Sequence, residues 1–449
     1  MQKYDMLKDS PGKSLLFFAV PIILGNLFQQ FYNMADSIIV GRFVGENALA
    51  AVGASYSLTT VFIMIAIGSG MGASVLISQF LGAKEYRKMK TSIYTALLSF
   101  LCVSIIMLIF GVLMNERLLL MLNTPSNILS DAVLYLEIYF IGLPFLFMYN
   151  VLSAIFNALG KSQIPLYLLI FSSILNIVLD LFMVINLHMG VAGVAIATVI
   201  AQGVSAVISF YILNCTLRNY EIFSEQKVEL YDLSMLKKMV YIAIPSILQQ
   251  SIVSIGMLLV QSVVNTFGSS ALAGYSAGMR VESICIVPMI ATGNAISTYT
   301  AQNLGASQID RVRKGYRVAY GIIITFAIII CITLNLTYKQ IVSAFLNETS
   351  GNEAFMVGSS YLKFISFFFV FIGLKSITDG VLRGSGDMVV FTLANLVNLG
   401  IRVFVAFRFA AVWGIQAVWY AVPMGWASNY LISFSRYMTG TWSKKNIIK

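Results

Sequence analysis

The chain has 449 residues, of which 58% are hydrophobic and only 11% are charged. A soluble domain carries about 25% charged residues, and the mean hydropathy of this chain is +0.84, so a soluble architecture is excluded. The net charge of +10 does not indicate a nucleic-acid partner, because the basic residues follow a membrane-topology pattern.

Twelve apolar segments, separated by charged or Gly/Pro-containing breaks, predict an all-α polytopic membrane protein with twelve transmembrane helices. Several segments exceed the ~20 residues that a bilayer requires, so these helices must tilt, bend or extend beyond it. The expected spans are residues 14–40, 48–80, 91–113, 131–158, 163–187, 190–217, 236–267, 271–304, 317–338, 353–381, 388–411 and 413–438.

The distribution of basic residues predicts the orientation. Only Arg42, Arg117, Lys339 and Arg408 fall on one side of the predicted topology. Most of the 29 Lys and Arg residues lie at the termini and in the loops on the other side. The positive-inside rule therefore predicts that both termini are cytoplasmic.

The two halves of the sequence repeat each other. Pro21 in "FFAVPIILGN" corresponds to Pro245 in "YIAIPSILQQ", and "QFLGAK" at 79–84 corresponds to "QNLGAS" at 302–307. Six helices per half is an even number, so both copies enter the membrane in the same orientation and form two pseudo-symmetric six-helix bundles. The predicted domains are an N-terminal lobe of residues 1–217, a cytoplasmic linker of residues 218–235 and a C-terminal lobe of residues 236–449. Two lobes that rock about a shared cavity suit a transporter better than a channel.

Four polar side chains of the first half are expected at similar depth in the outer half of the membrane. At ~1.5 Å rise per residue, Asp36, Asp180 and Thr198 all lie near the outer ends of their helices. Asn176 precedes Asp180 by one turn and shares its helix face. Two nearby carboxylates in a low dielectric cannot both stay ionised, so one takes up a proton or a hard cation binds between them. The sequence predicts an H+ or Na+ coupling site; a purely structural tie between helices is the alternative.

The second half differs at the corresponding positions. Gln261 stands near the position of Asp36, and Arg402 replaces Asp180. Lys375 and Asp379 are spaced for an ion pair on one helix, and Glu282 is expected to pair with Arg402 across helices. We interpret these charges as structural or gating pairs, with a transport role as the alternative.

Aromatic and methionine side chains are abundant, and a cavity lined by some of them would bind flat amphipathic cations. Pro21 is expected to bend the first helix and so to move Asp36. The residues expected to line the substrate cavity or to act in gating are Pro21, Tyr32, Asn33, Tyr139, Met257, Gln261, Glu282, Asp379 and Arg402.

Enzymatic activity is not expected. The sequence has no GxxxxGK[ST] phosphate-binding loop, a single histidine (His188) and four cysteines without CxxC spacing. We therefore expect no cofactor other than the coupling ion, H+ or Na+.

The sequence resembles the MATE (multidrug and toxic compound extrusion) family, and most of all its prokaryotic DinF-type branch. The segments that carry the resemblance are "VPIILGNLFQQFYNMADSIIVGRFVGENALAAVGAS", "NALGKSQIPLYLLIFSSILNIVLD", "GVAGVAIATVIAQ" and "IPSILQQSIVSIGMLLVQSVVNTFGSSALAGYSAG". The resemblance implies a cation-coupled antiporter that exports cationic amphipathic drugs by alternating access. It implies that the ion site of the N-terminal lobe uses Asp36, Asn176, Asp180 and Thr198.

The resemblance also implies a monomer in the cytoplasmic membrane of a prokaryote, with the lipid bilayer and small cationic substrates as its partners. The family's NorM-type branch uses acids in the C-terminal lobe as well, and Gln261 departs from that pattern. The alternative function is a flippase for a lipid-linked precursor, for which Arg280, Lys375 and Arg402 offer positive charge.

Overall fold

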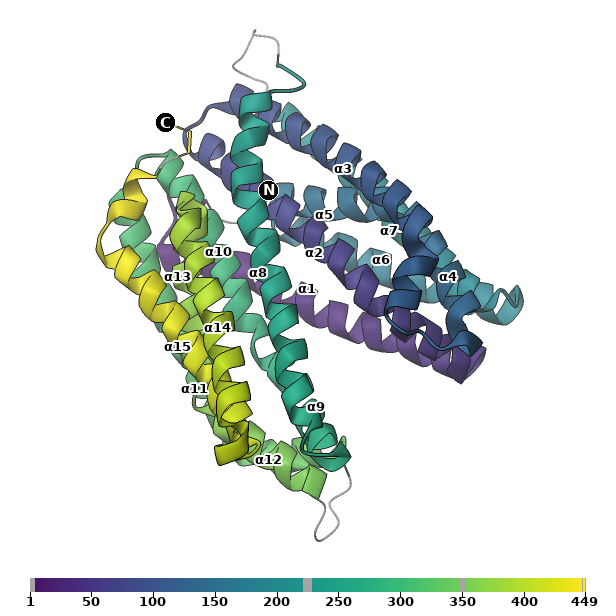
Figure 1. The fold of residues 1–449 in the computed structure, drawn as a ribbon. Coiled ribbons are helices and arrows are strands. Elements are labelled where there is room, and N and C mark those ends of the chain that lie inside the picture. Colours follow the sequence, from purple (N-terminus) through teal and green to yellow (C-terminus); the bar gives the residue numbers. More distant parts are fainter. Residues whose placement is uncertain (1–4, 221–227, 347–352, 446, 449) are drawn as a thin grey trace. The chain divides into compact units, whose positions relative to one another are not determined.

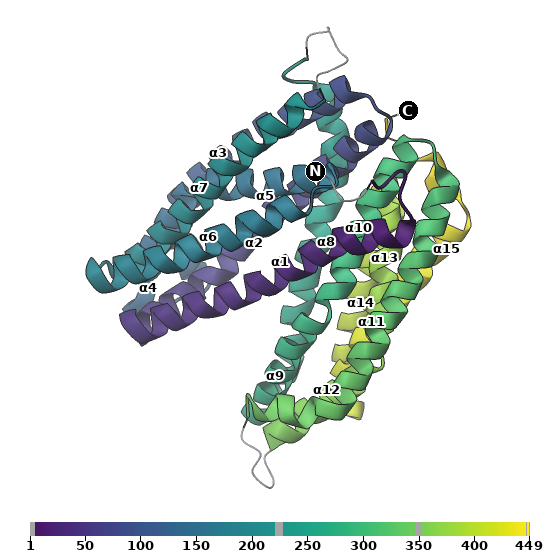
Figure 2. The same cartoon turned by 180° about the vertical axis from the view of Figure 1, so that it is seen from behind.

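The computed structural model describes residues 5–220, 228–346, 353–445, 447 and 448, and within them the chain is helical and has no strand. Figures 1 and 2 show the helices from opposite sides. The part of the predicted linker at 221–227, and Lys3, Lys227 and Lys449 of the basic residues, lie outside the described residues.

The helices divide into two compact units. The N-unit comprises Leu24–Ile247 and the C-unit comprises Met1–Ile23 with Leu248–Lys449. Two long helices, α1 (Pro11–Ile39) and α8 (Leu233–Asn265), therefore contribute residues to both units. The predicted lobes of residues 1–217 and 236–449 stay a prediction.

In the N-unit, α2 (Glu46–Gly82) and α7 (Gly190–Arg218) each pack against four other helices. Residues 24–39 of α1 also belong to this unit, where Gly25 lies against Leu169 of α6. The remaining elements of the unit are the π-helix η1 (Val40–Val44), α2 (Glu46–Gly82), α3 (Tyr86–Met121), α4 (Ser126–Ile141), α5 (Leu143–Ala158), α6 (Gln163–Leu181), the π-helix η2 (Phe182–Asn186) and α7 (Gly190–Arg218).

In the C-unit, α13 packs against α10, α11 and α15 (Figure 2). The elements of this unit after α8 are α9 (Ser269–Cys285), α10 (Val287–Gly305), α11 (Ile309–Ser343), α12 (Glu353–Ser366), α13 (Phe369–Ser385), α14 (Met388–Trp413), α15 (Gln416–Met438) and the short 3-10 helix η3 (Thr441–Lys444).

The helices agree with the predicted twelve spans. Within the described residues, nine helical segments are long and apolar enough to cross a membrane. The helix pairs α4–α5 and α12–α13, each bent by 52°, add two more, and α15 is the twelfth. Pro144 explains the first bend, because it opens α5 and cannot donate a backbone hydrogen bond. The chain is therefore a multi-pass membrane protein.

Glycines bring the helices into close contact. The glycines of "GSGMG" at 68–72 on α2 allow α8 to approach closely, because a Cβ on Gly68 would lie 2.4 Å from the Ile247 side chain. A Cβ on Gly72 would lie 2.5 Å from the backbone oxygen of Met239. Apolar burial does not drive helix association in lipid, so such close van der Waals contact stabilises the bundle.

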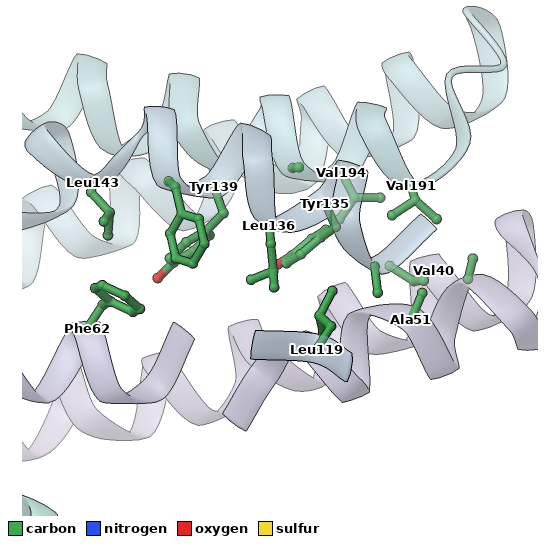
Figure 3. Packing of buried hydrophobic residues seen from close by; sticks show 14 of the residues in the cluster. Val40, Ala51, Phe62, Leu119, Tyr135, Leu136, Tyr139, Leu143, Val191 and Val194 are labelled. Atoms are coloured by element: carbon green, nitrogen blue, oxygen red, sulfur yellow. The ribbon is translucent and has the colours of Figure 1, made fainter. Parts of the chain in front are cut away.

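An aromatic core fills the N-unit between α2, α4 and α7, as Figure 3 shows. The rings of Phe62 and Phe140 lie 5.0 Å apart at 59°. Tyr135 and Tyr139, one turn apart on α4, stack with their ring centroids 6.3 Å apart. This core holds α4 beside the polar site described next.

Candidate ion-coupling site

The polar residues predicted on three helices of the N-unit come together in one cluster. Asp36 lies on α1, Asn176 and Asp180 on α6, and Thr198 on α7. Asn176, Asp180 and Thr198 are 1%, 0% and 8% exposed, and Asp36 is half-buried. A cluster this deeply buried must satisfy its polar atoms internally.

The side-chain amide of Asn176 links the cluster. Its hydrogen-bond surroundings orient the nitrogen toward Asp180 Oδ2 at 2.9 Å and toward the Tyr32 hydroxyl at 3.2 Å. The amide oxygen then faces Thr198 Oγ1 at 3.3 Å. Asn176 thus connects residues of α1, α6 and α7 and holds the Asp180 carboxyl in place.

The two carboxyl groups of the site touch each other. The carboxyl groups of Asp36 and Asp180 are close enough to interact directly with each other. One oxygen of each, Oδ1, is buried and has no hydrogen-bond partner among the described residues. No Lys or Arg side chain in the described part of the chain forms an ion pair with either acid. Two ionised carboxylates in contact repel each other strongly, so the pair requires a shared proton or a cation.

The chemistry of the donor set suits a proton or a hard cation. Two carboxyl groups, an amide oxygen and a hydroxyl supply oxygen ligands, and the two unpartnered Oδ1 atoms are free to accept a proton or a positive ion. Among the described residues no group of three or more His, Cys, Asp and Glu side chains gathers, so a multi-acid or thiolate metal centre is not indicated.

Both acids directly precede π-helical turns, which the sequence did not indicate. α1 passes into η1 at Val40, four residues after Asp36, and α6 passes into η2 at Phe182, two residues after Asp180. Such wide turns are rare, often mark functional sites, and shift the phase of the helix that carries them. They place both acids next to segments that can change their winding.

Tyrosines border the acids. Tyr32, predicted as a cavity residue, contacts Asn176, and Tyr139 is 6% exposed in the core cluster (Figure 3). Tyr135 was missed by sequence reasoning, although it is 8% exposed and close enough to Asp36 to interact electrostatically. The sequence feature that could have indicated Tyr135 is its spacing of one helical turn from Tyr139, which places both side chains on the same face of the helix. Asn33 lies outside the cluster, is exposed, and accepts a hydrogen bond from Gln29 within α1 at 3.1 Å.

The other predicted cavity residues lie on the C-unit. Pro21 is buried within the continuous helix α1, and on α8 Met257 is half-buried and Gln261 is exposed. The predicted pair of Lys375 and Asp379 is present, with Lys375 Nζ 3.1 Å from Asp379 Oδ2.

Further hydrogen bonds complete the surroundings of Asp379. Ser433 Oγ donates to Asp379 Oδ1 at 2.7 Å and Asn395 Nδ2 donates to Oδ2 at 3.3 Å. Both oxygens of this acid are therefore satisfied, unlike those of the N-unit pair.

Glu282 and Arg402 are near each other but form no ion pair. Glu282 is 5% exposed and accepts a hydrogen bond from the Tyr361 hydroxyl instead. Arg402 is 6% exposed, and its Nε has no hydrogen-bond partner in the described structure. The expected pairing across helices is thus replaced by a tyrosine from α12.

The fold and the buried acid cluster define a polytopic membrane transporter. Residues 21–182 and 245–407 match the MatE family. The chain therefore belongs to the MatE family of transporters and is not an enzyme. The family matches once in each half of the chain, in agreement with the predicted internal repeat.

Relatives match over nearly the whole chain. The probable multidrug resistance protein YpnP of Bacillus subtilis (strain 168) is 29% identical over 444 residues, covering 98% of each chain. The multidrug export protein MepA of Staphylococcus haemolyticus is 24% identical, covering 86% of this chain and 84% of that protein. The FAD transporter of Shewanella oneidensis is 24% identical and covers 77% of each chain.

Solved structures share the fold. The outward-facing conformation of a multidrug resistance MATE family transporter of the MOP superfamily has a TM-score of 0.89 and 23% identity, covering 98% of each chain. A MOP superfamily transporter from Pyrococcus furiosus also has a TM-score of 0.89 at 23% identity, covering 97% of this chain and 98% of that one. The predicted all-α fold with twelve transmembrane helices is confirmed.

Proposed function

We propose that this transporter is a cation-coupled antiporter that exports cationic amphipathic drugs and toxins in exchange for H+ or Na+. The observation that carries the proposal is the contact between the Asp36 and Asp180 carboxyl groups, each with an unpartnered buried oxygen. The similarity to a probable multidrug resistance protein and to a multidrug export protein supports the substrate class.

The coupling site comprises Asp36, Asn176, Asp180 and Thr198. A cation entering from outside neutralises the carboxyl pair and removes the repulsion between the two acids. The neutral pair favours a different shape of the α1 segment that carries Asp36, with Pro21 as the place where the helix bends. Drug and cation must differ in affinity for the two states, since only that difference lets a gradient drive export.

The proposed setting rests on the charge pattern for the side of the termini and on the family for the rest. Both termini face the cytoplasm, the protein is a monomer in the cytoplasmic membrane of a prokaryote, and alternating access exposes the drug site to each side in turn. A lipid flippase is not favoured, because Lys375, one of the three cationic residues that would support it, is neutralised by Asp379.

Efflux of a fluorescent cationic dye from proteoliposomes tests the proposal. An imposed pH gradient and an imposed Na+ gradient are compared for the wild type, Asp36→Asn and Glu46→Gln. Glu46 is a matched control because it is an exposed acid in the first turn of α2. One gradient should drive efflux in the wild type and Glu46→Gln and fail in Asp36→Asn. Efflux by Asp36→Asn at the wild-type rate would contradict the proposal.

A further inference from the structure

The C-unit contains a cavity of its own. A cavity of about 730 Å³ opens between the beginning of α11 and the end of α15. Its wall is aromatic and its rim carries Arg313 and Arg317. By the topology proposed above, this end of the bundle faces the cytoplasm.

The aromatic wall is ordered by ring contacts. Tyr437 lies 4.0 Å from Tyr316 and stacks on Trp442 with ring centroids 5.5 Å apart at 7°. Tyr316 and Trp442 are 3% and 1% exposed, so the floor of the cavity is fixed by packing. The hydroxyls of Tyr320 and Tyr430 hydrogen-bond across the cavity from α11 to α15.

The rim is positively charged and only partly neutralised. Arg313 and Arg317 are both exposed and act electrostatically on Tyr437. Arg313 forms an exposed ion pair with Asp310 at 3.3 Å. Arg317 has no ion-pair or hydrogen-bond partner among the described residues. The cavity therefore presents positive charge beside a rigid aromatic surface, a combination that binds an anionic group with an apolar extension.

The internal repeat supplies a comparison within the same molecule. In the N-unit, a cavity of about 590 Å³ follows "QFLGAK" at the beginning of α3 and is bordered by residues at the beginning of α8. Two of its three basic residues meet acids: Arg87 pairs with Glu229 at 3.4 Å and Lys88 with Glu85 at 2.6 Å. The Arg87 and Lys88 charges of the N-unit cavity are thus neutralised by acids, whereas Arg317 of the C-unit cavity has no acidic partner among the described residues.

The helices that form the C-unit cavity also expose aliphatic side chains farther along. Leu431 on α15 is 61% exposed, and Ile324 and Ile328 on α11 are 44% and 53% exposed. In a membrane-spanning helix such residues face acyl chains, and arginines at the helix ends lie at headgroup level. Positive charge at the level of the lipid phosphates, next to a surface that faces the acyl chains, is complementary to an anionic phospholipid.

We propose that this cavity is a binding site for the headgroup of an anionic phospholipid of the cytoplasmic leaflet. The phosphate lies between Arg313 and Arg317, the headgroup packs on Tyr437, and the acyl chains follow α11 and α15. The site goes beyond the proposed antiport and uses none of its residues.

Native mass spectrometry of the purified full-length protein tests the proposal. The protein is titrated with phosphatidylglycerol or phosphatidylcholine in detergent micelles. Phosphatidylglycerol should bind the wild type more tightly, and R313Q/R317Q should weaken its binding about 30-fold, since each interfacial basic residue changes binding about fivefold. R87Q/K88Q, the matched change in the N-unit cavity, should bind within about twofold of the wild type.

Three outcomes would overturn the assignment. They are equal binding of the two lipids by the wild type, undiminished phosphatidylglycerol binding by R313Q/R317Q, and equal loss in R87Q/K88Q. Full competition by soluble glycerol 1-phosphate would point to a free phosphate ligand and would also overturn it. R313K/R317K keeps the charge and should keep most of the binding, which excludes misfolding as the cause of a loss.

Discussion

Asp36 on α1 and Asp180 on α6 bring their carboxyl groups into contact, and one oxygen of each is buried without another partner. The buried acid Asp379 of the C-unit differs, because Lys375, Asn395 and Ser433 satisfy both of its carboxyl oxygens. Unsatisfied buried charge is costly, and natural proteins retain it where function needs it. The contrast supports the coupling role proposed for the N-unit pair.

Asp180→Asn should stabilise the protein while abolishing coupled export. The amide can hydrogen-bond to Asp36 and removes the like-charge contact, so we expect a gain of about 1–2 kcal/mol at pH 8. Thermal unfolding in detergent measures the gain, and Glu46→Gln should leave the unfolding temperature unchanged. A destabilised Asp180→Asn would show that the acids act as a structural tie.

Lys375→Met should destabilise the C-unit by about 3 kcal/mol, because it leaves the Asp379 carboxylate buried without its cation. K375M/D379N removes both charges and should recover most of the loss. Urea or thermal unfolding of the two variants in detergent measures the difference. Equal loss in both would mean that packing, not charge, is responsible.

Gly380→Ala should lower stability by more than about 1 kcal/mol, since the added Cβ would lie 2.4 Å from the backbone oxygen of Gly293. Gly321→Ala on α11 is the matched control, because nothing lies within 4 Å of its Cβ position. There the change should stabilise by roughly 0.5–1 kcal/mol. Similar effects of the two substitutions would contradict the close approach of α10 and α13.

Asp232 should stabilise the beginning of α8 in a pH-dependent way. Its Oδ1 accepts hydrogen bonds from the backbone N–H groups of Ser234 at 2.7 Å and Met235 at 3.2 Å. Hydrogen bonding, first from Ser234, lowers the pKa of this carboxyl. A lowered folded-state pKa means that its contribution is full above the unfolded value of about 3.9 and is lost as pH falls through the folded pKa.

Asp232→Ala should therefore cost about 1 kcal/mol at pH 7 and less near pH 3. Asp232→Ser, which retains a capping oxygen, should cost less than Asp232→Ala at pH 7, and its cost should fall by the same amount toward pH 3, because it too lacks the carboxyl group. Thermal unfolding of both variants at the two pH values measures this. A loss by Asp232→Ala that is the same at both pH values would contradict the capping role.

Hydropathy predicted the spans well, because an apolar run long enough to cross a bilayer rarely forms anything other than a transmembrane helix. It did not predict the break before Phe369, which lies within a continuous apolar run, whereas Pro144 in the sequence marks the bend after Ile141. The π-turns at Val40 and Phe182 were equally invisible, because one extra residue in a turn leaves the apolar composition unchanged.

The expected depth of each residue in the membrane predicted which polar side chains of the N-unit meet, because Asp36, Asp180 and Thr198 lie at similar depths along their helices. It did not predict the partner of Glu282, because Tyr361 reaches that acid through the rotation of α12 about its axis. Rotation is set by packing against neighbouring helices, and an almost uniformly apolar helix carries little sequence signal for it.

Competition between drug and cation on the purified protein tests the coupling role of the acid pair most directly. The affinity for a fluorescent cationic dye is measured against pH and against Na+ concentration for the wild type and Asp36→Asn, with Glu46→Gln as the control. We predict that one cation weakens dye binding at least tenfold in the wild type and the control, and has no effect in Asp36→Asn. Equal competition in the wild type and Asp36→Asn would show that the cation acts elsewhere, and the account would be wrong.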